Sequence, residues 1–448
     1  MDRISSLPDD VIIHILSFLT LKRSAQTSVL SKRWRILFAF SPNLDLLPYG
    51  NHRSFLNFVE ERVLSVSGNS SVKKFTLRYR TGTRTKHCIR HVLNRGGLSD
   101  LHLSLYTGDD GADLPCEIFT CKTLVELKLT DFFIKELPED ASLPALKKLL
   151  LGSVKFDSPH PQVCAFAKLL SACPVLEELV LDDLRWEQWK WSRSLSSRSL
   201  RRLTIRRTNF DADMSGLGNI TIDTPSVTHL EYADFVPSSY LVVNLNSLVE
   251  ATLNTVLTVD HLYEYLPSST DNITSDPTNL FKGMRNVQIM NLLFYETVEV
   301  FYRFRGAVPV FENLLHLSIK TNSDDCWRGL IILLNHCPNL HTLTIKGTLH
   351  YEAYNRSDCV CDCLSEYSFL MSCPVKVLKI TEYGGTPNEF LQLINILEKL
   401  SGLELLEVTT VGTAYEKFQI AKELQMLPKA LSKDQGQLAH HPVCQIQN

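Results

Sequence analysis

The sequence predicts an α/β fold in which a small helical unit precedes a solenoid of repeated strand-and-crossover units. Two observations carry this prediction. Apolar residues recur at helical spacing within about the first forty residues, and one six-residue leucine pattern recurs nine times further along the chain. Because each repeat returns the chain in the same direction, the solenoid is expected to form a curved parallel sheet with helical crossovers.

The first predicted helix spans residues 9–19. Pro8 suits the start of a helix, and Asp9 and Asp10 place negative charge at the positive end of the helix dipole. About three turns of helix cannot bury a wide apolar stripe alone, so the stripe needs partner helices or a partner protein. The stripe follows i, i+3, i+4, i+7 spacing and comprises Ile12, Ile15, Leu16 and Leu19.

Two shorter helices are predicted over residues 22–29 and 32–38. Trp34 and Leu37 recur at helical spacing with Leu30. Three helices within about forty residues form less core than an independent domain needs. The unit is therefore either a helical cap on a larger domain or a docking module.

Three blocks of this unit, residues 2–11, 15–19 and 27–35, resemble a plant-type F-box in order and spacing. Thr20-Leu21 departs from the Pro-Thr pair usual in that family, which predicts a less well defined loop. The resemblance implies docking onto the Skp-type adaptor of a cullin–RING ubiquitin ligase. It assigns the adaptor contacts, or the packing beneath them, to Leu7, Pro8, Ile12, Ile15, Leu16, Leu19, Leu30 and Trp34.

A leucine-rich repeat is predicted over residues 73–370, after the F-box-like unit (1–45) and a bridging segment (46–72) with a short helix near 55–64. Copies of the pattern up to Leu248 begin about 21–30 residues apart, which is the period of leucine-rich repeats. One unit cannot bury its leucines alone, so neighbours must stack; the alternative is an ordinary α/β sheet. The copies occupy residues 124–129, 146–151, 176–181, 200–205, 227–232, 248–253, 314–319, 340–345 and 403–408.

Crossover helices are predicted at residues 165–170 and 330–334, each followed closely by a Cys-Pro pair. The repeat is irregular between about 206 and 310. Within that stretch the polar residues 267–277 predict an inserted surface loop, because insertions into a solenoid map to loops on one face.

The last predicted unit spans residues 371–427. Its strand at 375–380, amphipathic helix at 388–400 and strand at 403–408 resemble the FBD module found at the C-terminus of many plant F-box proteins. Residues 428–448 are polar and aperiodic, and they are expected to form a disordered tail.

Composition indicates a protein that acts inside the cell. Its net charge of −3 lacks the basic footprint of a nucleic-acid-binding protein. The first residues contain no apolar leader, and no apolar run is long enough to span a membrane. The expected location is the cytoplasm, the nucleus or both, where the twelve cysteines would remain buried thiols.

No catalytic or cofactor-binding motif is recognisable, so we expect a non-catalytic protein without a cofactor. The sequence lacks a Gly-x-Ser-x-Gly elbow, a His-Glu-x-x-His pair and a phosphate-binding glycine loop. Cys359 and Cys363 form one metal-binding pair, but Cys373 and His350 make a poor second pair for structural zinc. A thiol-bearing loop is therefore the preferred interpretation.

A positively charged stretch begins among three tryptophans and extends to Arg207. Arginine and tryptophan are typical interface anchors, which makes Trp189 and Arg193 candidates for contact with a target protein. The alternative is a solvated loop whose tryptophans pack on the edge of the solenoid.

These features together predict the substrate-recognition subunit of a Skp–cullin–F-box type E3 ubiquitin ligase. The helical unit would hold the adaptor and through it a cullin, and the repeat would bind an unknown target protein. The alternatives are a leucine-rich-repeat scaffold outside any ligase and a metal- or nucleotide-dependent enzyme. Target-binding candidates are strand residues that alternate with the leucines: Glu126, Lys128, Glu178, Val180, Arg202, Thr204, Thr342 and Thr344.

Overall fold

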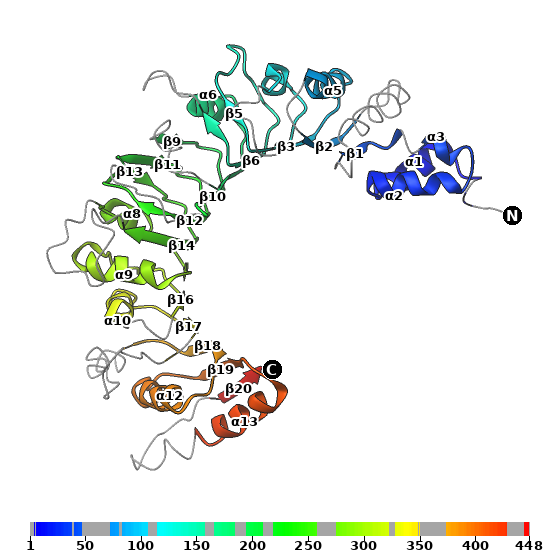
Figure 1. Cartoon of the computed structure of the whole chain (residues 1–448). Helices are drawn as coiled ribbons and strands as arrows, with labels where there is room; N and C mark the ends of the chain where they lie inside the picture. Colours follow the sequence, from blue (N-terminus) through cyan, green and yellow to red (C-terminus); the bar gives the residue numbers. More distant parts are fainter. Residues whose placement is uncertain are drawn as a thin grey trace. The chain divides into compact units, whose positions relative to one another are not determined.

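In a computed structural model, the chain divides into two compact units, Met1–Ala212 and Asp213–Asn448. Figure 1 shows the helices and strands of both units. Both units contain parallel strands joined by helices and turns. The structure describes residues 4, 6–37, 40–46, 72–79, 83–105, 114–156, 165–183, 194–208, 218–257, 275–321, 328–347, 349, 373–427 and 443–447.

The N-terminal helical unit contains the three predicted helices. Thr20 is the N-cap of the second helix, and its hydroxyl accepts a hydrogen bond from the backbone N–H of Arg23 at 3.4 Å. Thr20 therefore supplies a helix cap, which corrects the expectation of a loosened loop at this position. The elements are α1 (Asp9–Ser17), α2 (Leu21–Gln26), the 3-10 helix η1 (Thr27–Val29) and α3 (Trp34–Leu37).

The sheet of the first unit stacks its leucines in continuous rows. Leu77 is in register with Leu103, which is in register with Leu129. The row continues through Leu151 and Leu181, and all five side chains are at most 3% exposed. The strands are parallel and follow the order β1 (Asn43–Leu46), β2 (Lys74–Tyr79), β3 (Asp100–Leu105), β4 (Glu126–Thr130), β6 (Lys148–Gly152), β8 (Glu178–Asp182) and β10 (Arg202–Arg206).

Helices and short strands connect the main strands of this unit and cover the leucine rows. The predicted crossover at residues 165–170 is confirmed, and Phe166 and Leu169 in it are fully buried. The connecting elements are α5 (Thr83–Asn94), the 3-10 helix η4 (Cys116–Thr120), β5 (Phe133–Ile134), β7 (Lys155–Phe156), α6 (Ala165–Ser171) and β9 (Ser194–Ser196).

The second unit repeats this design with further parallel strands. Leu253, Leu292 and Ile319 are in register on neighbouring strands, and each is 1% exposed. The strands follow the order β12 (His229–Val236), β14 (Glu250–Leu257), β15 (Ile289–Leu292), β16 (His316–Lys320), β17 (Thr342–Lys346), β18 (Val377–Tyr383), β19 (Leu405–Thr410) and β20 (Val443–Gln447).

Helices again provide the crossovers of the second unit. The crossover predicted at residues 330–334 is confirmed by α10, and a capping box at Thr386 and Glu389 starts the helix predicted at 388–400. The elements are β11 (Ile220–Asp223), β13 (Tyr240–Asn244), α8 (Thr278–Gly283), α9 (Tyr295–Arg303), the 3-10 helix η5 (Arg305–Ala307), α10 (Arg328–Asn335), α12 (Pro387–Lys399) and α13 (Ala414–Leu424).

All nine leucine patterns form strands, and each strand begins two residues into its pattern. The predicted irregular stretch between about 206 and 310 is more regular than expected, because β12, β14 and β15 pair in register there. Strands β2 and β15 are absent from the predicted set because valine, phenylalanine or methionine replaces leucine in them. Strand β3 is also absent from that set, although Leu98, Leu101 and Leu103 give it the complete pattern.

The prediction that residues 428–448 form a disordered tail is wrong for residues 443–447. Val443–Gln447 forms β20, which pairs in parallel with β19 and places Leu406 opposite Cys444. An edge strand presents unpaired N–H and C=O groups, so a short polar segment can add to it without a strong hydrophobic pattern. The strands and helix predicted for residues 371–427 are present, and their assignment to an FBD module stays a prediction.

Several predicted features lie outside the described residues. They are the bridging helix at 55–64, Trp189, Arg193, most of the loop at 267–277, and the cysteines from Cys359 to Cys363. Within the described ranges, none of the helices combines the length and the apolar character needed to cross a bilayer.

Gly347 ends β17 in a conformation that other residues rarely adopt, with φ at 103°. A Cβ atom there would lie 2.2 Å from the backbone oxygen of Thr321. We therefore predict that Gly347→Ala lowers the free energy of unfolding by about 2 kcal/mol, measured by urea denaturation. Gly306→Ala is the matched control, because open space surrounds Gly306. Equal effects of the two substitutions would contradict the prediction.

Candidate protein-binding surfaces

The core of the helical unit consists of side chains that the sequence assigned to the adaptor interface or to the packing beneath it. Ile12 and Leu16 are 0% exposed and Trp34 is 2% exposed, and they pack together with Leu37. Leu7 and Leu19 pack partly buried against this cluster. Ile12, Leu16 and Trp34 therefore form packing beneath the surface, one of the two roles that the resemblance left open for them, because α1 turns that side towards α3.

A second apolar surface of the helical unit is exposed to solvent. Ile15 and Leu30 belong to the predicted set and lie on it, and Pro8 is exposed nearby. The spacing of Val11, Ile15 and Phe18 at i, i+4, i+7 is the sequence signal for this second stripe. We call this surface the apolar face; its large side chains are Val29 (86% exposed), Phe18 (76%), Ile36 (56%), Leu30 (53%), Val11 (41%) and Ile15 (37%).

Polar contacts hold the helices that carry the apolar face. Arg33 on the approach to α3 pairs with Asp9 at the start of α1, with Nε 2.7 Å from Oδ1. The Ser24 hydroxyl donates to the carbonyl oxygen of Leu16 at 3.3 Å. The Asn43 side-chain amide donates to the carbonyl oxygen of Ser17 at 2.6 Å, which ties α1 to β1. The apolar face is thus displayed on helices that are already fixed by their own contacts.

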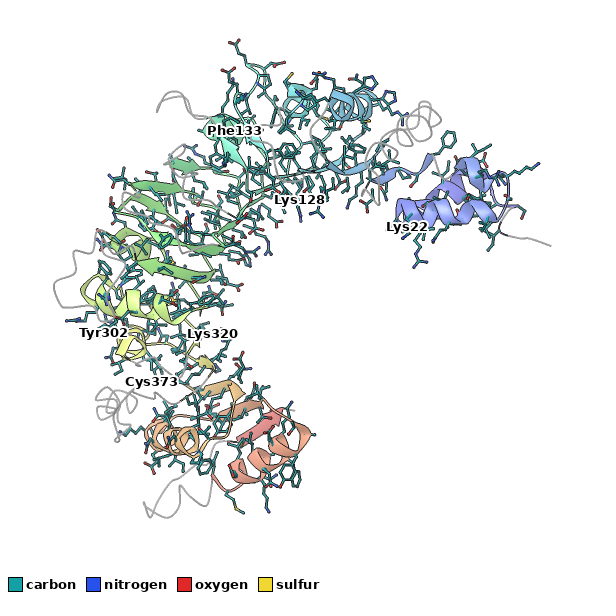
Figure 2. All side chains as sticks on the ribbon, viewed as in Figure 1. Lys22, Lys128, Phe133, Tyr302, Lys320 and Cys373 are labelled. Carbon is teal, nitrogen blue, oxygen red and sulfur yellow. The ribbon has the colours of Figure 1, made fainter. Side chains whose placement is uncertain are left out.

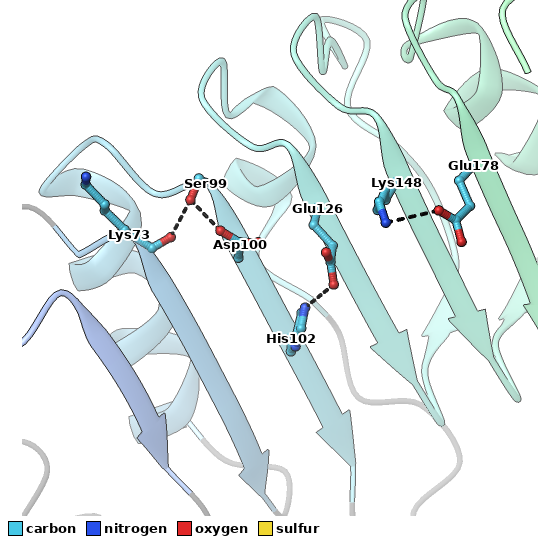
Figure 3. Close-up of polar contacts among 7 residues, drawn as sticks. All are labelled: Lys73, Ser99, Asp100, His102, Glu126, Lys148 and Glu178. Atoms are coloured by element: carbon cyan, nitrogen blue, oxygen red, sulfur yellow. Dashed lines mark hydrogen bonds and ion pairs between the residues drawn. The ribbon is translucent and has the colours of Figure 1, made fainter. Parts of the chain in front are cut away.

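The open face of the first sheet carries the side chains that alternate with the buried leucines. Charged pairs join neighbouring strands along this face (Figure 3). His102 Nε2 lies 2.6 Å from Glu126 Oε1, and Lys148 Nζ lies 3.1 Å from Glu178 Oε2. The hydrogen bond to Glu178 and the attraction of its charge raise the pKa of Lys148. Much of the charge on this face is therefore neutralised within the sheet.

The same pattern continues at the edge of the open face where the strands begin. The Ser99 hydroxyl lies 2.9 Å from the carbonyl oxygen of Lys73 and 2.5 Å from Asp100 Oδ2 (Figure 3). Lys147 Nζ lies 3.0 Å from Glu177 Oε1. Such cross-strand pairs stabilise neighbouring strands modestly and also fix the side chains that a target would meet.

The predicted target-binding residues that the structure describes separate into four groups. Glu126 and Glu178 are half-buried and engaged in the pairs above, whereas Lys128 and Arg202 are exposed. Val180, Thr204 and Thr344 are half-buried on the open face of their strands. Thr342 is wrong as an exposed candidate, because it is only 7% exposed. Its hydroxyl lies 3.0 Å from Nδ1 of His341, and its register partners on the neighbouring strands are His316 and Val377.

The described cysteines and acids do not form a reactive centre. Burial raises the pKa of the Cys173 and Cys337 thiols to about 12, which keeps them protonated at neutral pH. Cys88 is buried as well, whereas Cys116 is exposed, so the expectation of buried thiols holds only in part. Across the described ranges, no group of three histidine, cysteine, aspartate or glutamate side chains is placed to hold a metal ion.

A docking-type helical unit joined to leucine-rich parallel strands defines an F-box/leucine-rich-repeat architecture, and comparison with known proteins agrees. A family model for the F-box domain matches residues 4–44. A second model, described as "FBD-associated F-box protein At5g56370, LRR repeats", matches residues 88–235.

Relatives from Arabidopsis thaliana match along nearly the whole chain. F-box/LRR-repeat protein At3g58980 is 46% identical over 97% of this chain and 73% of its own length. F-box/LRR-repeat protein At3g62440 and putative F-box/LRR-repeat protein At5g15620 are each 44% identical over 97% of this chain and 98% of their own lengths. The chain therefore belongs to the F-box/leucine-rich-repeat family.

Lys148 lies between two carboxylates, because its strand places it opposite both Glu126 and Glu178. Replacing it by an acid puts like charges directly opposite one another on three neighbouring strands. We predict that Lys148→Glu lowers the free energy of unfolding by about 1 kcal/mol in urea titrations. Lys128→Glu is the control, since Lys128 faces Leu150 on the next strand. The account fails if the control loses as much stability as Lys148→Glu.

Proposed function

We propose that the chain is the substrate-recognition subunit of a Skp–cullin–F-box type E3 ubiquitin ligase. Its helical unit docks onto a Skp-type adaptor, and its strand face binds a target protein. The observation that carries the proposal is the apolar face, with Val29 86% and Phe18 76% exposed above a complete core of Ile12, Leu16 and Trp34. Several large, exposed apolar side chains on one small helical unit are typical of interaction sites in soluble proteins.

Membership in the F-box family supports the choice of partner for this surface. The core beneath the apolar face is filled by the unit's own side chains, so the face is available for a protein partner. An adaptor that covers it would remove these apolar side chains from water, at about 25 cal/mol per Å². The adaptor would in turn link the chain to a cullin inside the cell, in the cytoplasm, the nucleus or both.

The proposed mechanism is proximity. Holding a target on the strand face and the ligase scaffold on the helical unit raises the effective concentration of target lysines near the conjugating enzyme. The chain contributes two binding surfaces, and another subunit transfers ubiquitin.

The apolar face provides the test of adaptor binding. We predict that Phe18→Asp combined with Val29→Asp weakens binding of the full-length chain to a purified plant Skp-type adaptor by about a hundredfold or more, measured by calorimetry. Both side chains are exposed, so the fold and its circular dichroism spectrum should not change. Leu16→Asp is unsuitable for this purpose, because it would place a charge in the core of the unit.

A matched control is available on α13. Tyr415 and Phe418 are 72% and 66% exposed, and they lie far along the chain from the F-box helices. Tyr415→Asp combined with Phe418→Asp should leave adaptor affinity unchanged. Adaptor affinity that is absent in the wild type would favour a leucine-rich-repeat scaffold outside any ligase. Equal affinity of the wild type and the Phe18/Val29 variant would contradict the assignment of the adaptor contact to the apolar face.

A further inference from the structure

Two lysines lie side by side on the open face of the strands of the second unit. Lys320 on β16 is in register with Lys346 on β17, and both alternate with buried isoleucines. Figure 2 shows Lys320 on the strand side of this unit, with Tyr302 of α9 on the helix side. Neighbouring strands are about 4.8 Å apart, so the two positive charges repel each other in the absence of a partner.

This arrangement differs from that of two paired lysines on the open face, and from that of Lys128, which has no second lysine opposite it. Lys148 is paired with Glu178, and Lys379 on β18 is paired with Glu407 on β19 at 2.8 Å. Among the residues that the structure describes, no carboxylate forms an ion pair with Lys320 or Lys346. A like-charged pair opposes folding slightly, so its presence points to a role in binding.

Uncharged polar groups and an aromatic ring surround these lysines. Ser318 and Thr344 are register partners one step earlier on the same strands, and Asn291 on β15 continues that row. All three are half-buried, and the Asn291 amide also donates to Thr252 Oγ1 at 3.3 Å and to Glu250 Oε1 at 3.4 Å. Phe294 is 45% exposed, and Nζ of Lys320 lies 5.8 Å from the centre of its ring. A cation above an exposed aromatic ring is a frequent interface anchor.

The wider surroundings also favour a negatively charged ligand. Partial burial lowers the pKa of His316 on β16, and the charges of His341 and Lys379 lower it further. The strands β16 and β17 contain lysine but no arginine. Lysine acts as a compact point charge that suits single carboxylates, whereas the planar fork of arginine suits phosphate groups held by two hydrogen bonds.

We propose that this surface, called the lysine pair surface, binds an extended acidic segment of the target protein with carboxylates on alternate residues. Alternate side chains of an extended segment point the same way and lie about 6.8 Å apart, a distance that two flexible lysines can span. The polar row at Ser318 and Thr344 would receive the peptide backbone, and Phe294 would contact an apolar side chain beside the acids. This inference rests on the proposed role in target recognition, and it names the chemistry of the target.

The test uses the full-length chain and a fluorescent peptide of alternating serine and glutamate with one leucine at its end. Fluorescence polarisation at low salt should show binding, and added salt should weaken it because the contacts are exposed charges. Lys320→Gln combined with Lys346→Gln should weaken binding about tenfold. Lys147→Gln combined with Lys148→Gln removes the same charge from lysines that are already paired, and should weaken binding less than twofold.

A charge swap makes the test specific. Lys320→Glu combined with Lys346→Glu should lose the glutamate peptide and gain a peptide of alternating serine and lysine. Equal binding of the glutamate peptide by the wild type and both lysine variants would overturn the proposal. Exclusive binding of a phosphoserine peptide, or no binding of the glutamate peptide at low salt, would also overturn it.

The adaptor experiment separates this inference from the proposed function. Both glutamine variants should bind the Skp-type adaptor as the wild type does, because their substitutions lie on strands far along the chain from the apolar face. Adaptor binding without any binding of the glutamate peptide refutes the lysine pair surface alone. Peptide binding that depends on Lys320 and Lys346 in a chain that does not bind the adaptor refutes the ligase role alone.

Discussion

Rows of buried leucine and isoleucine across parallel strands are the interaction on which the rest of the structure depends. A single strand such as β4 cannot shield Leu127 and Leu129 from water, but in each sheet the same positions of the neighbouring strands stack against one another. Because side chains alternate along a strand, burying this row forces the residues between the leucines onto the open face. The cross-strand pairs of the open face and the lysine pair surface are therefore positioned by the same packing that stabilises the strands.

The two proposed binding surfaces, the apolar face of the helical unit and the open face of the strands, differ in how they would contact a partner. The helical unit buries one apolar stripe of α1 and leaves another exposed, so its binding energy would come from removing Phe18 and Val29 from water. The strand faces are polar and charged, and they select partners by complementary charge and hydrogen bonding. An apolar contact to the scaffold and a polar contact to the target can thus exist in one chain.

Most of the fold could be predicted from the sequence, because leucine spacing directly encodes which side of a strand is buried. The predictions failed where burial depends on tertiary partners. Ile12 and Leu16 carry the same periodic signal whether a partner helix or a partner protein covers them, and only the packing of Trp34 against them decides between the two. Thr342 fails for the same reason, since it is only 7% exposed once its strand is paired. Strand β20 was missed because its hydrophobic pattern is too weak to predict its pairing with β19. The lysine pair surface could not be predicted from the sequence, because Lys320 and Lys346 become neighbours only through the register of β16 and β17.

The central claim is that the exposed side of the helical unit, and not its buried stripe or the strand faces, meets the ligase scaffold. Hydrogen–deuterium exchange of the full-length chain, with and without a Skp-type adaptor, measures this most directly. The account predicts that the adaptor slows exchange within α1, η1 and α3 and leaves β16 and β17 unchanged. Slowed exchange confined to the strands, or no change in the helical unit at saturating adaptor, would contradict it.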